Sequence, residues 1–318
     1  MKQKQDTRFP QIKAIFGNRL QEDVLLSSFT SNRVGGKVEG LIICRSAVEL
    51  QNTIEQLWSL GSPFRLLGGG SNILICEEGI SGIVVHNQAK QIKIIENQEQ
   101  DIIWAEAGAA LNSVANYAAV NGFAGLEWAA GIPGTLGGAV YGNAGAFGSD
   151  ISSNFNMAEI LHPINGKQSW DSKKLDFKYR STKLKRESQN VIILEVTLKV
   201  FRNDAEVVLA RMQAIREKRK IKQPPGPSSG SMFKNPPGDS AGRLIEAVGL
   251  KGFQIGNAQI STKHANFFIN NGGASADDFH KLIRTAKEKV FDEFGIKLEL
   301  EVELWDNLPI SHNADGQV

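Results

Sequence analysis

Residues 122–148 constrain this chain most, because nine of them are glycines and Glu127 is the only charged residue among them. Each glycine in regular structure costs about 0.5–1 kcal/mol in conformational entropy. So many together indicate a backbone that needs positive φ angles or that lets another group approach closely. The near absence of charge favours a buried wall for a large, flat ligand with phosphates. A close-packed cluster of turns between strands is the alternative.

A second glycine run favours the ligand site. An apolar segment at 64–67 is followed by three glycines at 68–70 and then by Ser71 and Asn72. Consecutive N–H groups in a glycine turn form an anion-binding nest, and the two polar side chains add donors. Together the two runs predict a dinucleotide site, with one loop at the pyrophosphate and the other at the ring and ribose. The usual Rossmann fingerprint and the P-loop motif are both absent.

Seven motifs between residues 27 and 304 occur in the order found in one flavoprotein family. They are TSNRVGG (30–36), LLGGGSNIL (66–74), GIPGTLGGAVYGNAGAFG (131–148), YRS (179–181), GSMFKNP (230–236), AGRLIEAVGLKGFQIGNAQISTKHANFFIN (241–270) and LELEVEL (298–304). The chain therefore resembles the UDP-N-acetylenolpyruvoylglucosamine reductase family, in its shorter type, which makes UDP-N-acetylmuramate for peptidoglycan. The resemblance implies an α+β fold: a two-part FAD-binding region of the PCMH type, followed by an α+β substrate-binding domain.

The predicted domains are a first FAD-binding subdomain at 1–90, a second at 91–205 and a substrate-binding domain at 206–318. About 20 residues at the start and the tail after Leu308 are expected to be weakly ordered. Capping residues and helical periodicity predict helices at 46–61, 109–121, 206–222 and 275–295. Apolar runs predict strands at 40–44, 64–67, 83–85, 92–95, 102–105, 157–161, 177–179, 191–201 and 297–304.

Composition narrows the class of protein. The 318 residues carry a net charge of +2, so no strong attraction to nucleic acid or to a membrane surface is expected. No run approaches the roughly 18 apolar residues of a membrane span, and the polar start shows no secretory signal. Cys44 and Cys76 fit a reducing cytoplasm, and the five histidines show no metal-ligand spacing. We expect a cytoplasmic, monomeric enzyme with a small-molecule substrate and no metal.

The reaction that the resemblance implies is reduction of an enol ether conjugated to a carboxylate. Hydride passes from NADPH to FAD and then to the β-carbon of the enolpyruvyl group. Negative charge then develops on the α-carbon and spreads into the carboxylate. Such a site needs a fixed cation at the carboxylate, a polar partner near the enolate and an acid that protonates the α-carbon.

Three residues match the family's catalytic positions. Arg180 corresponds to the arginine that steadies the carboxylate and the enolate, Ser231 to the proton donor and Glu301 to the active-site glutamate. Without the motifs, each has an ordinary alternative: an arginine at a strand end, a turn serine and a glutamate on a solvated strand face. Glu299, Glu301 and Glu303 alternate along the predicted last strand and repel one another. A cleft that holds a cation would relieve that repulsion.

The same mapping gives the expected contacts to the flavin and the substrate. The flavin contacts are Gly68, Gly69, Gly70, Ser71, Asn72, Ile132, Pro133, Gly134, Thr135, Gly138, Asn143 and Ala144. Asn235 and, less directly, Lys222 match positions near the substrate's diphosphate. Lys222 belongs to the basic end of a predicted helix, where attraction of cations to the helix dipole is an equally good explanation.

Two positions depart from the family pattern. An arginine is expected at position 303, where this chain has Glu303, so a charge contact to the substrate is either missing or supplied by Lys297 or another base. The hydroxyl two residues after Arg180 belongs to Thr182, where the family often has serine. Neither departure touches the three catalytic positions.

The resulting hypothesis is a cytoplasmic, NADPH-using FAD enzyme that reduces UDP-N-acetylglucosamine enolpyruvate. Two alternatives stay open. One is another flavin oxidoreductase of the same superfamily, such as an oxidase of an alcohol or a sugar. Many of those link the flavin to a histidine, and neither glycine run contains one. The other is an inactive relative that senses UDP-sugars, for which Glu303 is the only support.

Overall fold

The computed structural model describes residues 8–305, so the tail predicted after Leu308 lies outside the described residues. Helix α1 (Phe9–Phe16) falls within the segment predicted to be weakly ordered. That prediction is wrong from residue 9 onward. Phe9, Ile12 and Phe16 are buried, because α1 packs this apolar face into the core under the first sheet.

The first sheet has the strand order β1-β2-β5-β3. Its strands are β1 (Leu20–Leu25), β2 (Lys37–Cys44), β5 (Ile80–Asn87) and β3 (Phe64–Leu67), with β2, β5 and β3 parallel. Helix α2 (Ala47–Ser59) connects β2 to β3 and begins at Ser46, whose side chain accepts a hydrogen bond from the N–H of Glu49. Gly61 ends the helix with a φ of +58°. This β-α-β unit, which the sequence predicted, carries the first glycine loop at the carboxyl end of β3.

The second sheet is antiparallel, with the order β12-β11-β13-β7-β6. Its strands are β12 (Gly166–Trp170), β11 (Phe155–His162), β13 (Ile192–Lys199), β7 (Ile102–Glu106) and β6 (Ile92–Ile95). Helices α3 (Leu111–Val120) and α4 (Leu136–Gly142) pack against it. The strand predicted at 177–179 is wrong. Lys178 and Ser181 exchange both backbone hydrogen bonds across a tight turn, and the φ of +52° at Arg180 does not fit a strand.

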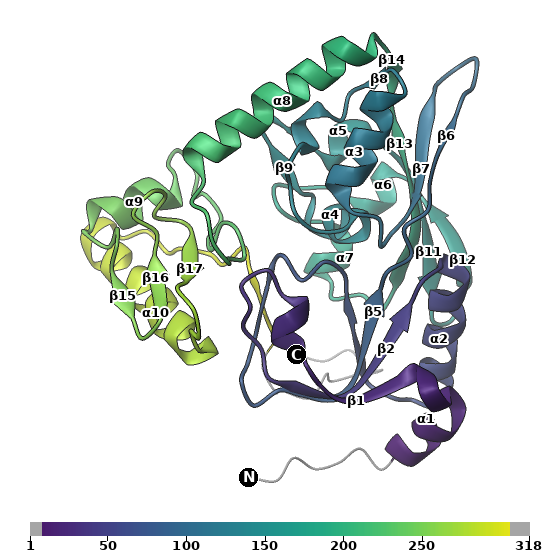
Figure 1. Ribbon diagram of the computed structural model, residues 1–318, viewed down its shortest axis with the longest axis horizontal. Helices are drawn as coiled ribbons and strands as arrows, with labels where there is room; N and C mark the ends of the chain where they lie inside the picture. The colour runs from purple at the N-terminus through teal and green to yellow at the C-terminus, as the bar shows by residue number, and fades with distance from the viewer. Residues whose placement is uncertain (1–7, 306–318) are drawn as a thin grey trace.

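A third sheet, β15-β16-β17, lies with two helices at the left of the view in Figure 1. Its elements are β15 (Gln254–Ile255), β16 (Ala258–Ile260), β17 (Phe268–Asn270), α9 (Ala241–Ala247) and α10 (Ala276–Phe294). The capping box of Ser275 and Asp278 begins α10, and the left-handed Gly295 ends it. The predicted inward face of α10 is confirmed, since Phe279, Leu282, Ile283, Ala286 and Val290 are all buried.

We call each of these three sheets, together with the helices that pack against it, a region. Helix α8 (Ala205–Lys222) runs between the second and third regions (Figure 1). Its buried Val208 and Met212 belong to the core of the second region, together with α3. The sequence places α8 at the start of the third domain. We propose that the boundary lies instead in the loop after Lys222, while each of the three larger sheets stays within one of the three predicted ranges.

The strand predicted at 297–304 is wrong over most of its length. Only β18 (Glu303–Trp305) is a strand, and it pairs in parallel with β4 (Ile73–Ile75) of the first region. Upstream of it, Leu300 instead forms an isolated antiparallel bridge with Phe233. The segment changes partners because it crosses from the third region to the first, and no single sheet can extend along it.

The remaining elements are short. They are η1 (Gly17–Arg19), η2 (Leu26–Phe29), β8 (Phe123–Ala124), η3 (Glu127–Ala129), β9 (Gly145–Ala146), β10 (Ser149–Asp150), α5 (Ile151–Asn154), α6 (Ser172–Leu175), α7 (Lys183–Arg186) and β14 (Phe201–Arg202).

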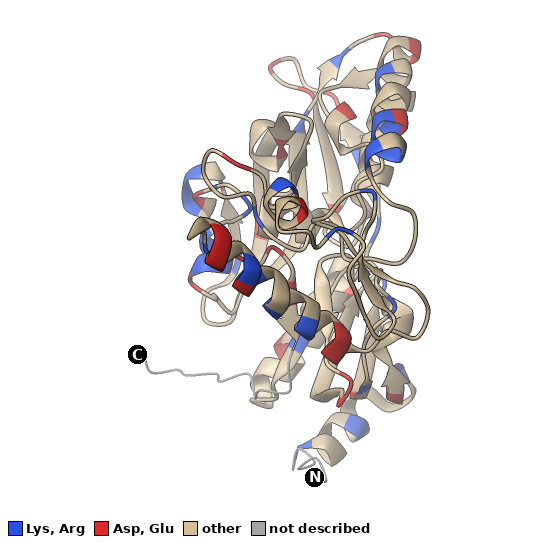
Figure 2. Cartoon of the chain, turned by 90° about the vertical axis from the view of Figure 1, so that its left-hand side faces the viewer, with Lys and Arg blue, Asp and Glu red and all other residues tan. Residues whose placement is uncertain are grey.

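Basic and acidic residues are interspersed over the side shown in Figure 2, in keeping with the small net charge. Between residues 8 and 305, none of the helices combines the length and apolar character that crossing a membrane requires.

Candidate active site

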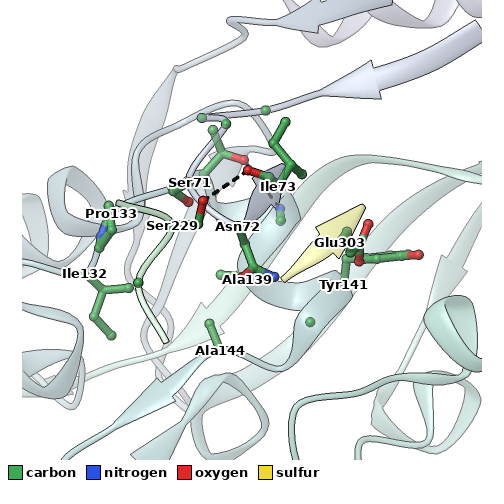
Figure 3. Close-up of a pocket in the computed structure, with 18 of the residues that line it drawn as sticks. Ser71, Asn72, Ile73, Ile132, Pro133, Ala139, Tyr141, Ala144, Ser229 and Glu303 are labelled. Carbon is green, nitrogen blue, oxygen red and sulfur yellow. Dashed lines mark hydrogen bonds between the residues drawn. The ribbon is translucent and has the colours of Figure 1, made fainter. Parts of the chain in front are cut away.

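A cavity of about 760 Å³ lies where the three regions meet. It is lined by both glycine loops, by the turn that carries Arg180, by the loop that carries Ser231 and by the segment with Glu301 and Glu303. Figure 3 shows Ile132 and Pro133 at one side of it, opposite Tyr141 and Glu303. This volume is in the range of sites that enclose a sizeable small molecule.

The two glycine loops touch each other. A Cβ placed on Gly69 would lie 3.0 Å from the Cα of Gly134, and one placed on Gly68 would lie 2.5 Å from Thr135 Oγ1. The Thr135 hydroxyl in turn accepts the N–H of Gly138 and caps α4. We call residues 68–72 and 131–138 the glycine wall. Its uncharged, side-chain-poor surface, with backbone N–H donors, suits a flat cofactor with a pyrophosphate.

Gly70 shows why one position must be glycine. Its φ is +58°, a left-handed conformation that costs other residues about 1–2 kcal/mol. An added Cβ would also collide with the carbonyl oxygen of Phe29. The loop keeps this shape through a 2.9 Å hydrogen bond from the N–H of Ser31 to the Gly70 carbonyl.

The opposite side of the cavity is charged. The Nε of Arg180 lies 2.8 Å from Glu301 Oε1 as an ion pair, and its Nη2 donates a 2.7 Å hydrogen bond to the Gly145 carbonyl. The Nε–H is buried and does not align with Oε1 as a hydrogen bond requires. Arg180 also has a left-handed φ of +52°, a strain of the kind that concentrates at functional sites. We call Arg180, Lys185, Glu301 and Glu303 the charged wall.

Backbone pairing brings Ser231 close to Glu301. The N–H of Glu301 donates a 3.0 Å hydrogen bond to the carbonyl of Met232, and the N–H of Lys234 donates to Glu299. Ser231 and Glu301 both line the cavity. Burial raises the pKa of the Glu301 carboxyl, and the positive charges of Arg180, Lys185 and Lys234 oppose that rise.

Asn72 links the two walls. Its side-chain Nδ2 donates a 3.0 Å hydrogen bond to the carbonyl of Glu301. Its own carbonyl accepts one from the N–H of Glu303 at 3.0 Å. A residue of the first glycine loop therefore fixes the segment that carries both glutamates.

Lys185 is a base that lines the cavity next to Glu303, where the family pattern has an arginine. Its Nζ lies 3.0 Å from Glu303 Oε1, and both side chains line the cavity. Lys297, which the sequence offered as a replacement base, instead lies over the ring of Phe291 and is not part of the lining. Sequence reasoning missed Lys185. Its only signal was its position five residues after Arg180, in a helix that was not predicted.

Most of the expected contacts line this one cavity, including the three catalytic positions. The flavin positions that do so are Gly68, Gly69, Gly70, Ser71, Asn72, Ile132, Pro133, Gly134, Thr135, Gly138 and Ala144. Asn143 does not. It is buried in a left-handed turn, with its amide donating to Asp150 and to the Lys178 carbonyl. It therefore shapes the loop from behind.

The two expected diphosphate contacts also lie outside the lining. Lys222 is exposed at the end of α8, and Asn235 accepts a hydrogen bond from the N–H of Ala241 at the start of α9. Arg219, one turn before Lys222, does line the cavity beside Gly131. The Arg219 guanidinium has no hydrogen-bond or ion-pair partner among residues 8–305. A half-buried, unpaired guanidinium suits a ligand anion, and nothing in the sequence distinguished it from its basic neighbours.

His86 lies outside this cavity. With Ser28, Ser31, Gly68 and Gly69 it lines a separate, open hollow on the other side of the first glycine loop. Burial lowers the pKa of its imidazole. In the described part of the chain, no histidine lines the main cavity, and no cluster of three or more His, Cys, Asp or Glu side chains could hold a metal ion.

Comparisons with known proteins agree with this geometry. Residues 38–168 match an FAD binding domain, and residues 220–305 match the C-terminal domain of UDP-N-acetylenolpyruvoylglucosamine reductase. The reductase of that name from Chloroflexus aurantiacus is 44% identical over 247 residues, 76% of this chain and 82% of the relative. The one from a Synechococcus species is 40% identical over 291 residues, 92% and 93% of the two chains. The crystal structure of the Thermus caldophilus reductase superposes with a TM-score of 0.76 at 35% identity, covering 90% of this chain and 99% of that one.

Proposed function

Because the chain belongs to the UDP-N-acetylenolpyruvoylglucosamine reductase family, we propose that it uses FAD and NADPH to reduce UDP-N-acetylglucosamine enolpyruvate to UDP-N-acetylmuramate. The product is a precursor of peptidoglycan. One observation carries the proposal: a single cavity joins the glycine wall to Arg180, Ser231 and Glu301, which come from distant parts of the chain.

The glycine wall fits FAD. A Cβ at Gly68 or Gly70 would collide with Thr135 or Phe29, and one at Gly69 would press against Gly134, so the surface at these three positions depends on bare backbone. Its N–H groups would hold the pyrophosphate, and Ile132 and Pro133 would offer an apolar surface to the ring system. When bound, the flavin supplies the hydride transfer to the enolpyruvyl β-carbon.

Arg180 would hold the substrate carboxylate. Its guanidinium is planar, carries a permanent charge and lines the cavity. The carbonyl of Gly145 and the carboxylate of Glu301 hold the group from two sides. A cation fixed in advance stabilises the charge that develops on the enolate, since nothing has to reorganise during the reaction. Glu301 would act through Arg180, by keeping the guanidinium in place.

Ser231 would donate the proton to the α-carbon. A serine hydroxyl is a weak acid, so the role requires positive charge near the oxygen that remains. Three cationic side chains line the same cavity: Arg180, Lys185 and Arg219. In the described chain, the Ser231 hydroxyl has no hydrogen-bond partner of its own that would compete with the substrate.

The direct test is anaerobic. The bound flavin is reduced with NADPH, the enolpyruvyl substrate is added, and the return of the oxidised flavin spectrum is recorded. The Ser231→Ala variant should keep its yellow colour and its reduction by NADPH, but lose roughly 10²–10⁴ in turnover with the substrate. Ser228→Ala removes another hydroxyl of the cavity and should lose less than about tenfold, the value of one ordinary hydrogen bond. Full turnover in Ser231→Ala would remove that residue from the proton-donor role.

The same assays separate the alternatives. Turnover driven by oxygen without NADPH would indicate an oxidase, whereas binding of UDP-sugar without flavin would indicate a sensor. The absence of a cavity-lining histidine within the described residues gives no support to a histidine-linked flavin.

We also propose that the enzyme is a cytoplasmic monomer. Sedimentation of the purified protein tests the oligomeric state. The contacts of Lys222 and Asn235 with the diphosphate stay predictions.

A further inference from the structure

In the mechanism above, Lys185 only adds positive charge to the cavity, and neither Lys185 nor its partner Glu303 has been given a contact with the ligand. Lys185 projects from α7, and its Nζ lies 3.0 Å from Glu303 Oε1 on β18. Both side chains line the cavity, and they are only 20% and 33% exposed, respectively. The pair lies beside the first one, since Lys185 is close enough to Glu301 to oppose the rise of its pKa.

Stability alone does not explain this pair. An exposed ion pair contributes about 0–1 kcal/mol, and a buried one often contributes no more than a well-packed apolar pair would. Here the two charges face a cavity, and their partial desolvation is a cost of folding. Such an arrangement is more easily explained by a ligand that the charges contact.

The charges of the lining favour an anionic ligand. Three cationic side chains, Arg180, Lys185 and Arg219, line the cavity against two carboxylates. An ammonium group has three donors. Glu303 pairs with the Lys185 ammonium, and no second acceptor for it occurs among residues 8–305, so its other donors are available to a ligand. A lysine held by one carboxylate at the edge of a cavity is therefore already oriented for a ligand oxyanion.

Tyr141 completes the surroundings of Lys185. The Lys185 Nζ lies 5.9 Å from the centre of the Tyr141 ring, and Figure 3 shows Tyr141 next to Glu303. Burial, together with the charge of Glu303, raises the pKa of the Tyr141 phenol. The phenol therefore stays neutral, and its ring attracts the ammonium weakly. The ion pair with Glu303 and the weak attraction of the Tyr141 ring both restrict the position of the Lys185 ammonium.

We propose that Lys185 binds an oxyanion of the substrate, either its enolpyruvyl carboxylate or its diphosphate, and that Glu303 and Tyr141 are the residues that position it. This inference rests on the proposed function of the same cavity. It assigns to Lys185 the charge contact that the sequence left open at position 303.

The test compares three variants with wild type, each purified with bound flavin. Lys185→Met should raise the KM for the enolpyruvyl substrate at least tenfold, while the rate of flavin reduction by NADPH stays within twofold. Lys185→Arg should restore most of the affinity. Lys183→Met is the matched control, because Lys183 lies on the same helix, pairs with Glu187 and is not part of the lining. An unchanged KM in Lys185→Met would overturn the inference.

Glu303→Gln tests positioning separately from binding. It leaves Lys185 charged but removes the carboxylate that holds it, so KM should rise by about threefold to fivefold with kcat nearly unchanged. A lower melting temperature with an unchanged KM in both Glu303→Gln and Lys185→Met would mean that the pair only ties α7 to β18, and this would also overturn the inference.

UDP as a competing ligand identifies which oxyanion is bound. If Lys185 contacts the diphosphate, Lys185→Met should weaken UDP binding as much as substrate binding. If it contacts the carboxylate, only the intact substrate should bind more weakly. Both results support the inference. Failure of the proposed function would show differently: reduced wild-type flavin would not be reoxidised by the substrate, whatever residue occupies position 185.

Discussion

The glycine wall and the charged wall face the same cavity but are built in different ways. The glycine wall uses backbone from two loops and contains no charged side chain. It works through shape, and a methyl group added at Gly68 or Gly70 would collide with Thr135 or with Phe29. The charged wall uses side chains from segments more than 100 residues apart, and it acts through electrostatic attraction and hydrogen bonding. Substitutions in the two walls should therefore have different effects. Those in the glycine wall should weaken binding of the cofactor, and those in the charged wall should slow the reaction of the substrate.

The largest effect is expected in the charged wall. Arg180→Met should lower kcat with the enolpyruvyl substrate by about 10²–10³, because it removes a fixed donor at the developing charge. Flavin content and reduction by NADPH should be retained. The kcat of Arg180→Lys should lie between those of wild type and Arg180→Met, since an ammonium keeps the charge but not the planar fork. Stopped-flow measurement of the two half-reactions checks this. A variant that lost its flavin instead would break the distinction between the walls.

The second effect belongs to the glycine wall. Gly70→Ala should weaken flavin binding by roughly 30-fold or more, because overpacking and left-handed strain together cost at least about 2 kcal/mol. Gly238→Ala is a matched control. Gly238 has a φ of +79°, but an added Cβ there meets no atom within 4 Å. Both variants should lose some stability, but only Gly70→Ala should be purified with little flavin. Equal flavin content in the two would show that the wall tolerates side chains.

The two walls also differ in how far the sequence predicted them. The glycine wall is local: the runs at 68–72 and 131–138 announce it, and all the flavin positions predicted within those runs line the cavity. The predicted family and the α+β fold class, with its FAD-binding region, are confirmed by the relatives and domains that match. Asn143 is the exception to the lining. It was assigned from the same motif, yet its side chain faces the loop behind the cavity.

The charged wall depends on tertiary structure. Arg180, Ser231 and Glu301 were predicted through motifs, because nothing in their local pattern distinguishes them from surface residues, and all three line the cavity. Lys185 and Arg219 were missed because their environment is set by residues far away in sequence. The predicted strand at 297–304 failed for a related reason. Its alternation is real at Leu298 and Val302, which are buried, but the chain there changes partners instead of following one sheet.

A third prediction concerns pH. Burial places the pKa of Glu301 above that of a free glutamate, against the opposing charges of Arg180, Lys185 and Lys234. The ionised form holds Arg180. Activity should therefore fall as the pH drops through this raised pKa, at a higher pH than an exposed glutamate would give.

Glu301→Gln tests the assignment. The variant should lose about tenfold in kcat/KM at neutral pH, because a neutral amide holds the guanidinium less firmly than a carboxylate does. It should also lack the acid limb, as measured by kcat/KM across mildly acidic to neutral pH at constant flavin content. An acid limb that persists unchanged in Glu301→Gln belongs to another group.

The smallest effect is expected where the two walls meet. Asn72 belongs to the glycine wall, but its side chain donates to the Glu301 carbonyl and holds the segment that carries both glutamates. Asn72→Ala should cost about 1 kcal/mol of unfolding free energy, the net value of one hydrogen bond. It should lower kcat/KM by roughly fivefold while the flavin stays bound, since the backbone contact of Asn72 with Glu303 remains.

Asn121→Ala is the control, because it removes a side-chain hydrogen bond to the Tyr117 carbonyl, away from the cavity. Denaturant unfolding should give similar losses for both variants, with turnover reduced only in Asn72→Ala. Loss of flavin in Asn72→Ala would mean that its side chain serves the cofactor rather than the charged wall, and the two walls would then not be separable at this residue.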